Sequence, residues 1–183
     1  MGPTYHARMA VATVRRAVDA DVDALVRIQS DTWRTAYAEL VPAAAIAELT
    51  GPAARETWRS AIEAGGGYHV FVASEGDWTV GFCAAAHYAG ADGAAIDEVS
   101  ALLVEPRWGR RGHGGRLLAA AAEALWAHGS TVGWAWVPEA DAVSRAFYGH
   151  AGWTADGAVR GLDTGSGTLR EVRLSGPLDL HLR

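Results

Sequence analysis

The spacing of apolar residues separates helical segments of the chain from strand-like ones. Helical spacing begins after Asp19, where Val22, Leu25, Val26 and Ile28 fall within one broad face. Further helices are predicted over Pro52–Ala64, about Gly114–His128 and Asp141–Gly152. Short β-type runs bounded by turn residues predict strands at Val11–Ala17, on both sides of the turn at Glu75–Asp77, at Ala95–Val104, at Thr131–Val137, and in the segments WTADGAVR and LREVRLSGPL.

The order of these elements predicts one α/β domain. A strand comes first, followed by two helices, three strands, a helix, a strand, a helix and the closing strands. Pro42 is expected to interrupt helical structure between the first two helices. We therefore expect a single domain over residues 11–183, with a mixed sheet, and a short disordered lead at residues 1–10.

Composition and charge narrow the functional classes. The formal charge of −5 argues against a partner that needs a broad basic face, so we expect neither nucleic-acid nor membrane binding. Cys83 is the single cysteine, which excludes an intrachain disulfide and favours a reducing, cytoplasmic location. The seven histidines show no metal-ligand spacing, and we predict no metal site.

A glycine-rich turn between a predicted strand and a predicted helix is the strongest chemical signal. Glycines at a helix start leave backbone N–H groups bare, and these N–H groups favour bound anions such as phosphates. The turn does not match the P-loop pattern, because Gly115 and Arg116 stand where Lys and Ser or Thr are required. It does not match the dinucleotide pattern either, because Leu117 replaces the last glycine.

The stretch ALLVEPRWGRRGHGGRLL (residues 101–118) closely resembles the coenzyme-binding signature of the GNAT superfamily of N-acetyltransferases. One position departs from it: Gly109 stands where the family has Gln or Arg, and Arg110 stands where a small residue is common. SRAFYGHAGW, DTWRTAYAELVP and LREVRLSGPL resemble three further segments of the same family, in consistent order.

The resemblance implies a mostly antiparallel, twisted sheet flanked by helices, whose central strands splay apart to hold acetyl-CoA. The residues it places at the coenzyme are of three kinds. Main-chain groups of the strand end would pair with the pantetheine arm. N–H groups of Arg111–Gly115 would hold the pyrophosphate, with Arg110 and Arg111 adding positive charge, and the start of the helix predicted at Asp141–Gly152 would touch the coenzyme. The residues concerned are Leu102, Leu103 and Val104; Arg110, Arg111, Gly112, His113, Gly114 and Gly115; and Asp141 and Ser144. Asp141 and Ser144 equally suit a helix start.

The resemblance also implies catalytic and acceptor residues. Glu98 matches a family carboxylate that acts as a base, often through water, and a structural or acceptor-binding role stays open for it. Tyr148 matches a tyrosine placed near the sulfur, where it would act as general acid; the alternative is an aromatic side chain that packs its helix onto the sheet. Trp33 and Tyr37 are expected to line the acceptor pocket or to belong to the core.

The function implied is transfer of an acetyl group from acetyl-CoA to a primary amine by direct attack in a ternary complex. The acceptor would be a small molecule or a peptide, and a homodimer fits the family. The alternative is a GNAT-like domain that binds acyl-CoA without catalysis, as a sensor or interaction module.

Overall fold

The computed structural model describes residues 12–165 and 167–180, and its centre is one seven-stranded sheet. The strands are β1 (Ala12–Arg16), β2 (Tyr68–Glu75), β3 (Trp78–Ala89), β4 (Ala95–Val104), β5 (Val132–Pro138), β6 (Thr154–Asp163) and β7 (Thr168–Pro177). Their order in the sheet is β1-β2-β3-β4-β5-β7-β6, and every neighbouring pair is antiparallel except β4 with β5. The predicted mixed and mostly antiparallel sheet is confirmed. The lead predicted at residues 1–10 lies outside the described residues.

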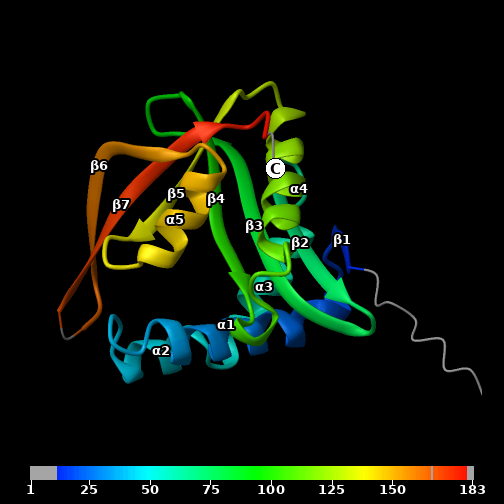
Figure 1. Cartoon of the computed structure of the whole chain (residues 1–183), viewed down its shortest axis with the longest axis vertical. Coiled ribbons are helices and arrows are strands. Elements are labelled where there is room, and N and C mark those ends of the chain that lie inside the picture. The colour runs from blue at the N-terminus through cyan, green and yellow to red at the C-terminus, as the bar shows by residue number, and fades with distance from the viewer. Residues whose placement is uncertain (1–11, 166, 181–183) are drawn as a thin grey trace, which may run out of the picture.

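Five helices accompany the sheet in the described part of the chain (Figure 1). They are α1 (Val22–Ala36), α2 (Ala43–Leu49), α3 (Pro52–Glu63), α4 (His113–Trp126) and α5 (Ala142–His150). The sequence did not predict α2. This helix begins directly after Pro42, whose carbonyl accepts a hydrogen bond from the Ile46 amide at 3.0 Å. Its seven residues are too few for a helical apolar pattern to stand out.

Helices cover both faces of the sheet and enclose two apolar clusters. Residues of α4 (Leu117, Leu118 and Leu125) pack on one face, while Leu25 and Ile28 of α1 pack on the other. Strand β3 serves both layers, because successive side chains of a strand point to opposite faces. Its neighbouring residues Cys83 and Phe82 accordingly belong to the α4 cluster and the α1 cluster. The sheet therefore has a buried core on each side.

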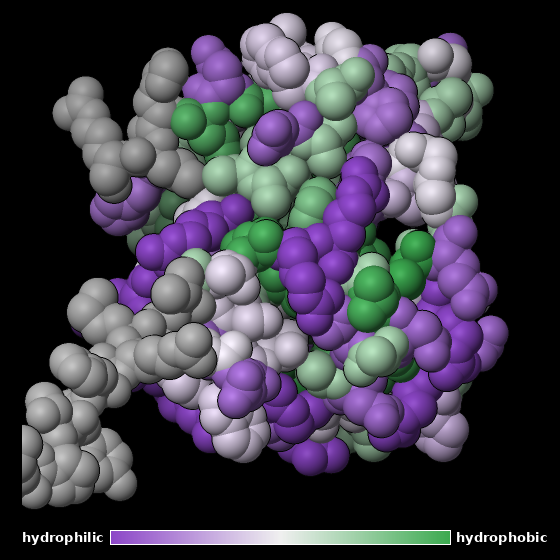
Figure 2. Space-filling view, turned by 90° about the vertical axis from the view of Figure 1, so that its right-hand side faces the viewer, coloured by the Kyte–Doolittle hydropathy of each residue, from purple (hydrophilic) through white to green (hydrophobic). Residues whose placement is uncertain are grey.

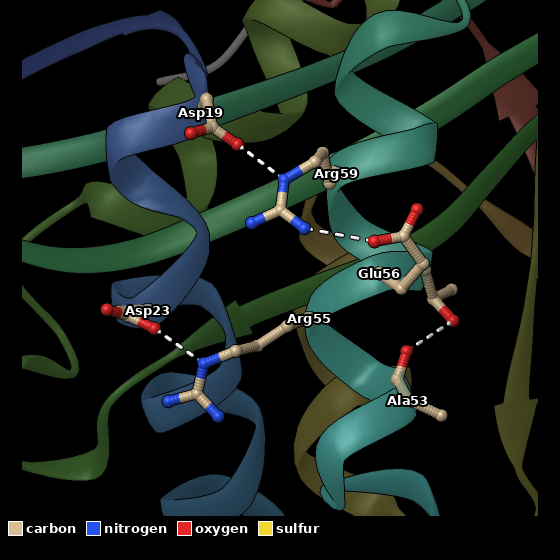
Figure 3. A network of polar contacts seen from close by, with 7 residues as sticks. Asp19, Asp23, Ala53, Arg55, Glu56 and Arg59 are labelled. Atoms are coloured by element: carbon tan, nitrogen blue, oxygen red, sulfur yellow. Dashed lines mark hydrogen bonds and ion pairs between the residues drawn. The ribbon is translucent and has the colours of Figure 1, made fainter.

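Ion pairs and one aromatic hydrogen bond join α3 to α1. Arg55 of α3 reaches Asp23 of α1 at 2.7 Å, and Arg59 reaches Asp19, in the 3-10 turn just before α1, at 2.8 Å. Figure 3 shows both pairs at the exposed edge between α3 and the start of α1. Deeper between the helices, the Trp58 indole N–H donates to the Gln29 side chain at 2.8 Å. Trp58 also packs against the ring of Phe82, with centroids 4.8 Å apart. Because exposed ion pairs add little stability, this apolar contact contributes most to holding α3 in place, and it fixes where Trp58 lies.

The face that carries α4 and β1 is mostly hydrophilic. Figure 2 shows polar side chains spread over this side of the molecule, with hydrophobic ones confined to small separate areas. Within residues 12–165 and 167–180, none of the helices combines the length and the hydropathy that crossing a membrane requires.

Two facing glycines make room for the buried Trp153. Gly133 of β5 pairs with Gly176 of β7, and a Cβ added at Gly176 would lie 2.3 Å from the indole ring of Trp153. The Trp153 side chain is 1% exposed, and its ring stacks on Tyr148 of α5 with centroids 5.2 Å apart. The glycine pair thus sets the position of Tyr148 through Trp153.

We predict that Gly176→Ala destabilises the protein by roughly 1–3 kcal/mol or more, because the new methyl group must displace Trp153. Gly149→Ala is the matched control: it lies in α5, nothing is within 4 Å of an added Cβ, and it should stabilise the fold by roughly 0.5–1 kcal/mol. Urea denaturation measures both changes. A Gly176→Ala variant as stable as the parent would show that Trp153 has room to move.

Candidate active site

The two central strands β4 and β5 part soon after they meet. Their parallel ladder contains a single paired position, Glu98 with Trp134. Beyond it, β4 carries a bulge: Ala84 and Ala85 of β3 pair with Ala101 and Val99, so Ser100 is the extra residue. The edge of β4 that faces β5 is consequently free of strand partners from Val99 onward, which confirms the predicted splay.

A cavity of about 290 Å³ fills the space where the strands part. Its walls come from two regions of the chain. One half is formed by the splayed strands and α5, and its residues are Val99, Ser100, Ala101, Leu102, Leu103, Trp136, Val137, Pro138, Ser144 and Tyr148. The other half is formed by α1, α3 and the β6–β7 hairpin, and its residues are Gln29, Trp33, Tyr37, Val41, Trp58, Leu162, Leu169 and Glu171.

The glycine turn leads into the first residues of α4, beside this cavity. Gly112 has a left-handed φ of 81° and precedes the first helical residue, His113, without a side-chain cap. The Arg116 amide donates to the Gly112 carbonyl at 3.1 Å, whereas no partner is found among the described residues for the amides of residues 113–115. A Cβ at Gly114 would lie 3.1 Å from the ring of Phe147, so a larger residue would have to push that ring aside. The turn therefore offers a row of unpaired N–H donors at the positive end of a helix.

Glu75, at the end of β2, holds this turn from behind. Its carboxylate accepts from His113 Nε2 and from Arg111, each at 2.9 Å. These two hydrogen bonds and the Arg111 charge lower the pKa of Glu75 below its usual range. The His113 side chain is buried, so only its main-chain N–H group is available to a ligand. Arg111 also lies over the Trp108 ring at 4.8 Å, which orients its guanidinium.

The exchanged order of Gly109 and Arg110 has a backbone consequence. Gly109 adopts an extended conformation that any residue tolerates, with φ −60° and ψ 158°. Arg110 takes a φ of 59° and is the one non-glycine residue with positive φ in the described chain. The turn thus places its left-handed residue where the signature commonly has a small residue, and a side chain occupies that strained position.

Tyr148 reaches the cavity from α5 and is 5% exposed. Burial, followed by the nearby Cys83 and Tyr37, raises the pKa of Tyr148 well above its ordinary value. Burial also raises the pKa of the Cys83 thiol. Both groups therefore stay protonated at neutral pH. The phenol can donate a hydrogen bond, while Cys83, fully buried in β3, is no nucleophile.

Asp141 links the two halves of the site. It is the N-cap of α5, and its carboxylate accepts from the Ser144 amide at 2.9 Å and from the Ser144 hydroxyl at 2.7 Å. The Tyr37 hydroxyl, at the end of α1, donates to the same carboxylate at 2.8 Å. Burial and Asp141 raise the pKa of Tyr37. Asp141 thus has a capping role in the structure, and its contact with a coenzyme stays a prediction.

The structure brings some of the predicted residues together and leaves others apart. Leu102, Leu103, Ser144, Tyr148, Trp33 and Tyr37 share the cavity, and the rings of Trp33 and Tyr37 lie 5.4 Å apart. Glu98 lies where β4 and β5 part but is not among the cavity residues. Its carboxylate accepts from the Tyr88 hydroxyl at 3.1 Å. Val104 lies beyond the cavity, where it packs against the core under α4.

Glu171 of β7 is the charged cavity residue, and sequence reasoning missed it. It is 7% exposed and pairs with Arg160 across the β6–β7 hairpin at 2.6 Å. The sequence LREVRL mixes charged and apolar residues without strict alternation, which gives no sign of which charge is buried. In the described part of the chain, no three His, Cys, Asp or Glu side chains gather as a metal site.

Comparisons with known proteins match this architecture. Residues 66–155 match the acetyltransferase (GNAT) domain family. The uncharacterised N-acetyltransferase YuaI of Bacillus subtilis (strain 168) is 30% identical over 130 residues, which cover 70% of this chain and 73% of that protein. The chain therefore belongs to the GNAT family of N-acetyltransferases.

Solved structures agree on the fold. The PaiA N-acetyltransferase of Thermoplasma acidophilum, in complex with coenzyme A, matches with a TM-score of 0.76 and 16% identity over 91% of this chain and 99% of that one. YncA of Salmonella typhimurium, a putative acetyltransferase with its cofactor acetyl-CoA, matches with a TM-score of 0.71 and 22% identity over 94% and 96%.

Replacing Arg110 by glycine should stabilise the protein by about 1 kcal/mol, because glycine adopts positive φ without the steric cost that a side chain incurs. Gly112→Ala, at the second left-handed position of the turn, should destabilise it by roughly 1–2 kcal/mol for the converse reason. Chemical denaturation of both variants gives the values. A less stable Arg110→Gly protein would mean that the Arg110 side chain makes compensating contacts.

Proposed function

We propose that this protein binds acetyl-CoA and transfers its acetyl group to a primary amine by direct attack within a ternary complex. The observation that carries the proposal is the single cavity into which both halves of the site open, with Tyr148 on its wall. Family membership supports the reaction type, and the two halves provide separate places for the acetyl donor and for the amine.

The described residues fit a coenzyme with phosphates and an amide-bearing arm. The unpaired amides of residues 113–115 suit the pyrophosphate, and the absent side chains of the glycine turn leave room for it. The free edge of β4 at Leu102–Val104 suits the pantetheine amides, which would pair with it as an added strand does. Arg111 is paired with Glu75, so the positive charge available to the phosphates would come from Arg110 in the turn and Arg116 in the first turn of α4.

Acetyl-CoA supplies an activated thioester, and the protein supplies position and hydrogen bonds. The amine nitrogen attacks the thioester carbonyl, a C–N bond forms, the C–S bond breaks with its electron pair on sulfur, and the proton lost from nitrogen passes through water to a base. Tyr148 donates a hydrogen bond to the developing thiolate. Its raised pKa disfavours full proton transfer, since an ordinary thiol has a pKa near about 8.5, but keeps the donor proton in place.

Glu98 is the proposed base and acts through water. Glu98 lies at the point where the strands part and directly precedes Val99 of the cavity wall in the chain. Glu98→Gln should lower kcat/KM about 100-fold, within the range usual for a general base. Tyr88→Phe, which removes only the hydrogen bond to Glu98, is the matched control. Unchanged kcat/KM in Glu98→Gln would move the base elsewhere.

Acetyl-CoA should stabilise the protein by about 2.7 kcal/mol at 100 times its Kd, a rise in melting temperature of roughly 5–10 °C for a domain of this size. Thermal unfolding with and without acetyl-CoA gives the shift, and release of free thiol in the presence of an amine gives the reaction. An unshifted melting temperature would rule out the proposed function. A shift without thiol release for any amine would leave an acyl-CoA-binding domain.

Tyr148→Phe should lower kcat about 100-fold while the Kd of acetyl-CoA changes little, because the lost hydrogen bond forms only as charge develops on sulfur. Tyr68→Phe is the control, since this tyrosine of β2 is 48% exposed. Single-turnover kinetics under saturating acetyl-CoA separates chemistry from product release. Full kcat in Tyr148→Phe would show that its role is packing on Trp153.

A further inference from the structure

We call the half of the cavity formed by α1, α3 and the β6–β7 hairpin the acceptor half; it is lined by aromatic side chains and carries one charge. Trp33, Tyr37 and Trp58 line it from α1 and α3, and Trp136 faces them from β5. Among the described residues of the cavity, Glu171 is the only one with a formal charge. An ammonium group is attracted both to aromatic faces and to a carboxylate, so this combination favours a cation.

The Glu171 carboxylate is held in place but only half used. Arg160 donates to Oε2 at 2.6 Å, and no donor to Oε1 is found among the described residues. Arg160 is itself fixed by stacking over Trp136 at 4.5 Å. The side chain of Glu171 is 9% exposed and that of Arg160 is 41% exposed, so the anion is buried at the cavity while its partner faces solvent.

The negative charge of Glu171 acts within the cavity. Together with burial and Asp141, it raises the pKa of the Tyr37 hydroxyl, which lines the same half of the cavity. A ligand carboxylate placed here would meet Glu171, with no cationic side chain among the described cavity residues to balance it. A buried uncompensated anion is costly, so the site disfavours acceptors with an acid group beside the amine.

We propose that the acceptor is a primary alkylammonium ion on a small aromatic or other apolar body without a carboxylate, and that Glu171 Oε1 binds its charge before it is deprotonated. This inference rests on the acetyl transfer proposed above. A cavity of about 290 Å³ that must also admit the acetyl end of the coenzyme favours a small acceptor over a polypeptide.

The test compares 2-phenylethylamine with L-phenylalanine, which differ by one carboxylate. With the parent enzyme, kcat/KM should be at least about 100-fold higher for the amine, the discrimination expected when a buried charge meets a like charge. Glu171→Gln should raise KM for the amine about tenfold or more and reduce this preference, because the carboxylate that sets it is gone. A preference for phenylalanine, or an unchanged preference in Glu171→Gln, would overturn the proposal.

Asp156→Asn is the matched control. Asp156 pairs with Arg173 across the same two strands at 2.7 Å, and Arg173 stacks over Trp134 at 4.3 Å, but none of the three lines the cavity. This variant breaks an equivalent ion pair and should keep the amine preference of the parent. Loss of the preference in Asp156→Asn as well would assign the effect to the hairpin.

Three further outcomes separate this inference from the proposed function. Faster acetylation of a peptide with a free N-terminus than of 2-phenylethylamine would overturn the acceptor class and leave acetyl transfer intact. Stabilisation by acetyl-CoA without acetylation of 2-phenylethylamine would also overturn it. Absence of any stabilisation by acetyl-CoA would instead reject the function on which it rests.

Discussion

The rest of the site depends on the early separation of β4 and β5. Two parallel strands normally continue their ladder, yet these two share a single paired position, and the bulge at Ser100 turns β4 aside directly after it. An exposed strand edge is usually a liability, since its N–H and C=O groups invite pairing with other chains. Here that edge lies inside the molecule, where α1 and α5 line the same opening as β4. The sheet thus leaves a gap between β4 and β5, and the unpaired edge of β4 is not exposed to other chains.

The remaining parts are arranged around this opening by buried contacts. Gly133 and Gly176 admit Trp153, and Trp153 supports Tyr148. On the other side, Glu105 lies just before the glycine turn and pairs with Arg27 of α1 and with Arg107, while 3% exposed. Because removing one partner would leave a buried charge uncompensated, these contacts are costly to lose. Through Arg27, Glu105 connects the end of β4 to α1, the helix that carries Trp33 and ends next to Tyr37 of the cavity.

Much of the fold could be predicted from the sequence, because runs of β-type residues bounded by turns and helical spacing of apolar residues mark the elements. All seven strands and four of the five helices were predicted in this way, whereas α2 is too short to show a helical pattern. The glycine turn was predictable, since bare amides at a helix start need glycine whatever surrounds them. The burial of Glu171 could not be predicted. The sequence of β7 does not show which of the charged residues Arg170, Glu171 and Arg173 is buried, because that depends on how β7 pairs with β5 and β6. The dual role of Asp141 likewise depends on Tyr37, 104 residues away.

The carboxylate of Asp141 couples the two halves of the site to each other. It holds the end of α1 through Tyr37 and the start of α5 through Ser144, and α5 carries Tyr148. Whatever steadies one helix reduces the freedom left to the other, and free-energy coupling between two sites is reciprocal. In the ternary complex proposed above, an acceptor that orders the end of α1 would therefore tighten coenzyme binding by the same factor by which the coenzyme tightens acceptor binding. Through this one side chain the two substrates would bind synergistically, so that the ternary complex would be more populated than two independent affinities give.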